Sequence, residues 1–94
     1  MIWSDKQTVT LLVRGEEIKV EYRVPSAIEY EELIEELQKQ TIARDSVAFV
    51  KFVTHIDGFN SAEECVNVGG TKNLVRVVYE EILKSASIDV ELKN

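Results

Sequence analysis

The sequence has few of the residues on which catalytic sites and secreted scaffolds depend. Its 94 residues include one cysteine, Cys65, and one histidine, His55. A single cysteine excludes a disulfide within the chain and indicates a reducing compartment. No apolar run approaches the roughly 18 residues that a membrane span needs, and the N-terminus lacks the pattern of a signal peptide. We therefore expect a cytoplasmic protein with no membrane partner.

Positive charge is also scarce. The chain carries 17 acidic and 11 basic residues, a formal net charge of −6, and acidic residues outnumber basic ones in both halves. The resulting field repels phosphate groups, and no basic patch offsets it. We therefore expect no nucleic-acid partner.

What the chain does contain is the composition of a small globular domain. Apolar residues make up 45% and charged residues 30% of it, which is typical of folded chains. We expect residues 1–94 to form one domain with an α+β fold, an N-terminal β-hairpin followed by three or more packed helices. A domain this small buries a limited share of its surface, so a partner or a homo-oligomer is expected to add to its stability.

Residues 8–24 are predicted to form the hairpin. Apolar residues recur at every second position on both arms, a period of two that is typical of an antiparallel pair with one buried face. The turn falls at residues 14–17, where Gly15 can adopt a positive φ. The alternating apolar positions are Val9, Leu11, Val13, Ile18, Val20, Tyr22 and Val24.

Residues 26–40 are predicted to form the first helix, after Pro25 ends the second strand. Ser26 and Glu29 have the spacing of a capping box, in which each side chain binds a free amide of the first turn. The apolar stripe of this helix is Tyr30, Leu33, Ile34 and Leu37. Its glutamates, Glu29, Glu31, Glu32, Glu35 and Glu36, form either a docking face for a basic partner or a solvated face.

The segment 44–56 fits two structures. Its β-branched and aromatic content favours a strand, but helical spacing gathers its apolar residues on one arc and its polar residues opposite. We predict a helix. A strand over 47–53 would instead return to the hairpin and give a β-grasp fold, which is the alternative architecture.

Two more helices are predicted, over 61–67 and 71–86. Ser61 and Glu64 repeat the capping-box spacing, and the second of these helices follows a Gly69–Gly70 break with Thr71 as its expected N-cap. Leu74, Val75, Val78, Tyr79 and Ile82 form its apolar stripe. The remaining residues are expected to form a short turn or a frayed end.

We expect no catalytic, cofactor or metal site. Catalysis by a cysteine–histidine pair would require His55 and Cys65 to be in contact and the thiol to be activated. Asp57, Asn60, Glu63 and Glu64 supply oxygen ligands, but the spacing of a calcium loop is absent. The glycine pair before Thr71 lacks the spacing of a phosphate-binding loop. The chain is therefore interpreted as a non-enzymatic binding protein.

Three aromatic residues are candidates for a protein-binding surface: Trp3, Phe59 and Tyr79. Large aromatic side chains either complete a core or anchor an interface. Trp3 and Phe59 lie in segments without periodicity, so the pattern does not decide between the two roles.

The order of these motifs resembles one group of tail assembly chaperones from long-tailed bacteriophages. The matching stretches are residues 21–26 (Glu-Tyr-Arg-Val-Pro-Ser), residues 49–53 (Phe-Val-Lys-Phe-Val) before 56–59 (Ile-Asp-Gly-Phe), and residues 78–83 (Val-Tyr-Glu-Glu-Ile-Leu) with a Lys-Asn end. The resemblance spans nearly the whole chain. The acidic first helix and the glycine pair have no clear counterpart in that group.

The resemblance implies a role in building phage tails inside a bacterial host. Such chaperones coat the helical tape-measure protein before the tail tube assembles around it, and they also contact the tail tube protein. A different class, a small regulatory or adaptor protein such as an antitoxin-like binder, remains the alternative. An enzyme remains a third reading only if His55 and Cys65 meet in a cleft.

Overall fold

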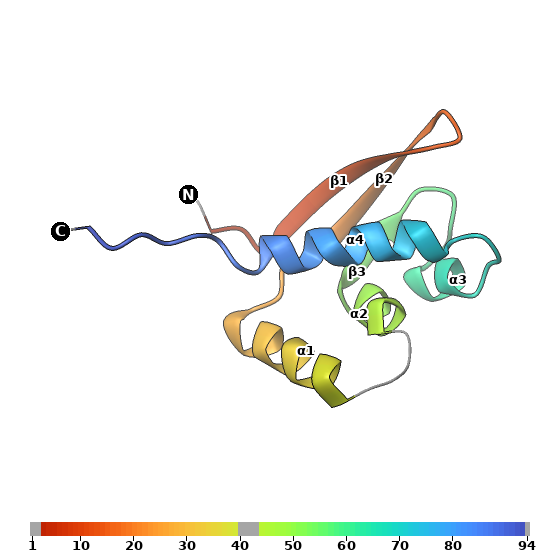
Figure 1. Cartoon of the computed structure of the whole chain (residues 1–94). Coiled ribbons are helices and arrows are strands. Elements are labelled where there is room, and N and C mark those ends of the chain that lie inside the picture. Colours follow the sequence, from red (N-terminus) through yellow and green to blue (C-terminus); the bar gives the residue numbers. More distant parts are fainter. Residues whose placement is uncertain (1–2, 40–43, 94) are drawn as a thin grey trace.

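The computed structural model describes residues 3–39 and 44–93, and the side chains of all of these except 36–39 and 44. The elements follow the order β1 (Lys6–Val13), β2 (Glu16–Arg23), α1 (Ala27–Lys39), α2 (Arg44–Phe52), β3 (Val53–Ile56), α3 (Ala62–Val66) and α4 (Lys72–Ser85) (Figure 1). The predicted α+β fold, an N-terminal hairpin followed by helices, is confirmed.

The hairpin forms with the predicted turn. Arg14 and Gly15 are its two loop residues, and both have positive φ, 50° and 82°. This combination matches the right-handed twist of the two strands. The pairing places Val13 opposite Glu16 and Val9 opposite Val20, which puts the alternating apolar residues on one face. The observed strands start two residues earlier and end one residue earlier than the predicted hairpin.

The predicted helix over 44–56 is wrong in its last four residues. Helix α2 ends at Phe52, and residues 53–56 form β3, which pairs antiparallel with β2. The sheet therefore has the order β1–β2–β3, with β2 in the centre.

A β-bulge explains why this strand looked helical. The register passes from Glu21 opposite His55 to Tyr22 opposite Val53, so Thr54 is an extra residue on β3. As a result, Val53 and Ile56 are both buried while the two residues between them are exposed. A spacing of three between inward side chains is the spacing of a helix, and the sequence pattern cannot separate the two cases.

The alternative β-grasp prediction required a strand over 47–53. Residues 47–52 are helical, so that requirement is not met, although a strand does return to the hairpin directly afterwards.

The core lies between one face of the sheet and the helices α2 and α4. Helix α4 crosses the hairpin, α2 packs beside it, and α1 stands to one side (Figure 1). The buried apolar residues come from β2, β3 and every helix: Val20, Tyr22, Leu33, Ala48, Phe49, Phe52, Val53, Ile56, Cys65, Val75, Val78 and Ile82. Asp45 and Lys72 link the starts of α2 and α4 through a 2.7 Å ion pair.

The other helices match their predicted positions within one residue where the structure describes them. Residue 40 and the side chains of Glu36 and Leu37 lie outside the described part. Both capping serines accept a hydrogen bond from the third helical amide, Ser26 from Glu29 and Ser61 from Glu64, each at 3.1 Å. Residues 87–93 form no helix or strand and run away from the hairpin turn (Figure 1).

The prediction that the side chain of Thr71 caps α4 is wrong. Thr71 precedes α4, but its side chain accepts no amide from that helix. Its hydroxyl instead donates back to the carbonyls of Cys65 and Val68, at 2.8 and 3.0 Å. Because the hydroxyl is used for these carbonyls, Thr71 ties the end of α3 to the start of α4.

Candidate protein-binding site

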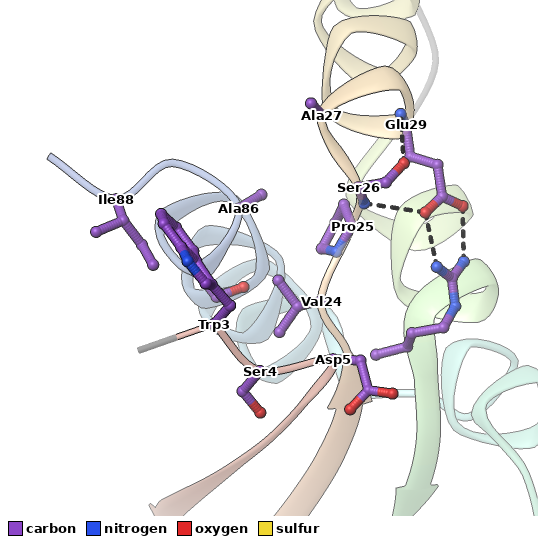
Figure 2. A pocket seen from close by; sticks show the side chains of 12 residues that line it. Trp3, Ser4, Asp5, Val24, Pro25, Ser26, Ala27, Glu29, Ala86 and Ile88 are labelled. Carbon is purple, nitrogen blue, oxygen red and sulfur yellow. Dashed lines mark hydrogen bonds and ion pairs between the residues drawn. The ribbon is translucent and has the colours of Figure 1, made fainter. Parts of the chain in front are cut away.

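A groove opens at the end of the sheet opposite the hairpin turn. Three segments that are far apart in the sequence line it: residues 3–5 before β1, residues 23–29 between β2 and α1, and residues 85–88 at the end of α4. Its volume is about 860 Å³. Figure 2 shows Trp3 and Ile88 on one side of the groove and Glu29 on the other.

The wall between β2 and α1 is built by a capping box. Pro25 is buried, and its ring stops β2 because it offers no amide for pairing. Ser26 then starts α1: its hydroxyl accepts the Glu29 amide, and its own amide donates to the Glu29 carboxylate at 3.0 Å. These two bonds fix the direction in which the helix leaves the groove.

Glu29 is also held by Arg23. The guanidinium donates two parallel hydrogen bonds to the carboxylate, at 2.7 and 2.8 Å. Arg23, together with the Ser26 amide, lowers the pKa of Glu29 from 4.5 to about 2. The same guanidinium lies 4.8 Å from the centre of the Phe52 ring, so this wall is joined to the core.

The other two walls are held by hydrogen bonds to main-chain carbonyls. The Val24 amide donates to the Asp5 carbonyl at 2.9 Å, which continues the hairpin pairing past β1. At the end of α4, the Ser85 hydroxyl donates to the Ile82 carbonyl at 2.7 Å. The Tyr22 hydroxyl donates to the Glu81 carbonyl at 3.3 Å and ties α4 to the sheet. Burial raises the pKa of Tyr22 above its ordinary value, which favours the protonated hydroxyl that donates this bond.

Trp3 is the most informative of the predicted anchor residues. Trp3 is 61% exposed although it lines the groove. Ile88, also about half exposed, lines the same groove and was not a predicted site residue. An exposed indole beside aliphatic and charged groups can hold an apolar side chain of another polypeptide and hydrogen-bond its backbone through the ring N–H.

The other two predicted anchors lie elsewhere. Phe59 follows β3 and Tyr79 lies in the middle of α4, and both are half-buried and pack against the core. Neither lines the groove with Trp3. The structure therefore does not bring the three aromatic candidates together, and a role of any of them in binding stays a prediction.

His55 and Cys65 occupy different environments. His55 is exposed on β3, with its Nε2 atom 3.3 Å from the carboxylate of Asp57. The Lys19 amide and then His55 hold the pKa of Asp57 below its usual value. Cys65 is fully buried, and burial raises the pKa of its thiol, which disfavours the reactive thiolate.

Two of the remaining polar candidates, Asn60 and Glu64, bind each other. Glu64 accepts hydrogen bonds from the amide and side chain of Asn60 at 3.5 and 3.1 Å. Among residues 3–39 and 44–93, no three acidic, histidine or cysteine side chains group as metal ligands would. Within the same residues, no helix is long and apolar enough to cross a lipid bilayer.

No family model matches the chain, and neither a curated protein nor a solved structure matches it.

Proposed function

We infer that this chain is a non-enzymatic tail assembly chaperone that binds the tape-measure protein of a long-tailed phage in the cytoplasm of a bacterial host. The observation that carries the proposal is the exposed indole of Trp3 in a groove of about 860 Å³. Tryptophan is enriched among the residues that contribute most to protein–protein affinity.

The groove is one reason to propose a client that binds as a helix. A tape-measure protein presents apolar helical surface, and such a helix binds by placing side chains one turn apart into an apolar groove. Trp3 and Ile88 supply apolar contacts on one side. The fixed Arg23–Glu29 pair on the other side limits the rearrangement that binding requires, since the wall is already ordered.

The charge of the chain supports repeated, reversible binding. A formal charge of −6 on 94 residues makes neighbouring bound copies repel one another. Each contact can then stay weak while many copies together cover a long client, and the coat can be released as the tube forms.

The proposal is tested by co-expression with a tape-measure protein from the same genome. We expect the client to become soluble and to co-purify with the wild-type chain. Trp3→Ala should reduce the recovered client at least about tenfold, the effect of a hot-spot residue. Val47→Ala is the control, because Val47 is 53% exposed on α2 but does not line the groove.

The result also separates the alternatives. If client recovery is the same with and without this chain, the tail-chaperone function is wrong. If Trp3→Ala and Val47→Ala bind the client equally well, the function stands but the groove is not the binding site. Co-purification with a toxin or sensor protein, and not with tail proteins, would favour the adaptor function.

A further inference from the structure

Strand β1 has an open edge. The odd-numbered residues of β1 pair with β2, because Val13 faces Glu16 across the two-residue turn and the pairing alternates from there. The amides and carbonyls of the even-numbered residues point away from β2, and the described sheet has no strand on that side. Lys6 is covered by the Ser4 hydroxyl, which contacts its carbonyl at 2.7 Å. Thr8, Thr10 and Leu12 therefore form the open edge.

The open edge lacks the usual protection against strand addition. Natural edge strands are protected by charged residues, proline or a bulge. Residues 7–13 (Gln-Thr-Val-Thr-Leu-Leu-Val) contain no charge, no proline and no glycine, and β1 pairs with β2 without a bulge. Leu12 is 74% exposed. This edge has the composition of a strand that accepts a partner.

The C-terminal segment (residues 88–93) has the composition of such a partner. Apolar and charged residues alternate strictly along it (Ile-Asp-Val-Glu-Leu-Lys), which is the period of a strand with one buried face. Its apolar side chains are nevertheless exposed by 48%, 82% and 92% at Ile88, Val90 and Leu92. The segment forms no strand in the structure.

One antiparallel register pairs the C-terminal segment with the open edge of β1 along the whole length of the segment. With Val13 opposite Ile88, Leu11 falls opposite Val90 and Val9 falls opposite Leu92. The three apolar residues of the C-terminal segment then continue the apolar face of β1, where Val9 and Leu11 are only half-buried. The charged residues of the segment fall opposite the three residues of the open edge, so their main-chain groups form the ladder.

On the outer face, this register sets opposite charges in two rows and like charges in the third. Lys19 lies opposite Thr10 on β2, and Glu91 would lie on the other side of Thr10. Glu21 lies opposite Thr8, and Lys93 would lie on its other side. Both rows set opposite charges on the two sides of β1, two strand spacings or about 10 Å apart, where salt screens most of the attraction. The third row sets Asp89 against Glu17, two strand spacings or about 10 Å apart, where salt screens most of the repulsion.

The register requires a second copy of the chain. Ile88 lines the groove beside Trp3 and Ser4, at the start of β1. Val13 lies at the other end of β1, seven residues after Lys6, which corresponds to about 23 Å along a strand. Ile88 therefore cannot reach Val13 of its own chain when the segment runs antiparallel to β1.

We propose that the C-terminal segment of one copy adds as a fourth strand to the open edge of β1 in the next copy. Each copy donates one segment and accepts another, so the contact is head-to-tail and generates a ring or a filament. This assembly does not depend on the identity of any client.

The assembly is tested by measuring the mass of the purified chain against its concentration. We expect the mass to rise from 10.7 kDa to at least about twice that value as the concentration increases. The double change Val90→Asp, Leu92→Asp should keep the chain monomeric, because it places charges on the apolar face. Asp89→Asn with Glu91→Gln is the matched control, because it keeps the apolar face and should still assemble.

A second pair of variants tests the open edge of β1, which accepts the segment of the next copy. Thr10→Pro removes an amide from the open edge and should abolish assembly, whereas Thr10→Val keeps the amide and should assemble. A circular dichroism spectrum shows whether the proline variant is folded, and the changes at 90 and 92 decide the question if it is not. A wild-type chain that stays monomeric overturns the proposal. Assembly that is lost with Thr10→Pro but kept with Val90→Asp, Leu92→Asp also overturns it, because β1 would then pair with β1.

The register is tested by a disulfide. The double variant Val13→Cys, Ile88→Cys should form a ladder of linked copies under oxidising conditions, since the two positions are directly opposite in a closely spaced pair. The variant Val9→Cys, Ile88→Cys places the thiols four residues out of register and should form no ladder. Equal ladders from both variants would contradict the register.

Discussion

Strands β1 and β2 have the same length and the same alternating pattern but very different surroundings. On β2, Val20 and Tyr22 are buried; on β1, Val9, which faces Val20, and Leu11 are only half-buried. The difference follows from strand order, because β2 has a neighbour on each side and β1 has one. Alternation sets which face of a strand points inward, and the position in the sheet sets how deeply that face is buried. The β2 side therefore contributes more to stability, and the outer edge of β1 stays unpaired in the described sheet.

The largest expected effect compares a core residue with an exposed residue of β1. Phe49 is fully buried, so Phe49→Ala should lower the free energy of unfolding by about 3–5 kcal/mol. Leu12→Ala removes a mostly exposed side chain and should change it by less than about 0.5 kcal/mol. Urea unfolding of both variants measures the difference. Equal losses would mean that the outer side of β1 is covered in the isolated protein.

The sharpest comparison uses the two valines that face each other across the hairpin. Val20 is fully buried and Val9 is half-buried, and the same substitution removes the same atoms from each. Val20→Ala should cost about 2–3 kcal/mol, and Val9→Ala should cost about 1 kcal/mol, because only the first opens an enclosed cavity. A larger loss at Val9 would contradict the assigned strand order.

The Arg23–Glu29 pair should give a smaller effect that depends on pH. Folding lowers the pKa of Glu29 from 4.5 to about 2, so the pair contributes fully above pH 4.5 and its contribution disappears as the pH falls to about 2. Glu29→Gln keeps the capping geometry and removes the charge. Because Arg23 is partly exposed and water screens the pair, we expect a loss of about 1 kcal/mol at pH 7.

Unfolding of wild type and Glu29→Gln at pH 7 and near pH 2 measures this effect. The difference between the two should close at the lower pH. Glu31→Gln, at an exposed glutamate of the same helix, is the control and should change little at either pH. A difference that persists near pH 2 would mean that Glu29 acts through packing and not through its charge.

Much of this fold could be predicted because local chemistry agrees with it. Apolar residues at every second position and Gly15 define the hairpin, and Ser26 and Ser61 mark helix starts through the bonds that they make. The error at β3 has an equally local cause, since the bulge at Thr54 gives a strand the spacing of a helix. Without β3 beside β2, the sequence could not show that β1 is an edge strand.

The candidate site could be predicted only in part. Trp3 was a candidate because it is a large aromatic residue outside any periodic segment. Its groove requires residues 3–5, 23–29 and 85–88 to meet, and that is a result of tertiary packing. Ile88 could have been found from the alternation of residues 88–93. Phe59 and Tyr79 carry the same kind of signal as Trp3 but pack against the core, and composition alone does not separate these environments.

The most direct test of the central claim uses the fluorescence of Trp3 during binding. The chain contains one tryptophan, and it lies in the candidate site and is 61% exposed. Titration with the tape-measure protein should shift the emission to shorter wavelengths and shield the indole from a soluble quencher, with saturation at a fixed stoichiometry. Binding of the client with no change in emission or quenching would contradict the claim that this groove holds another polypeptide.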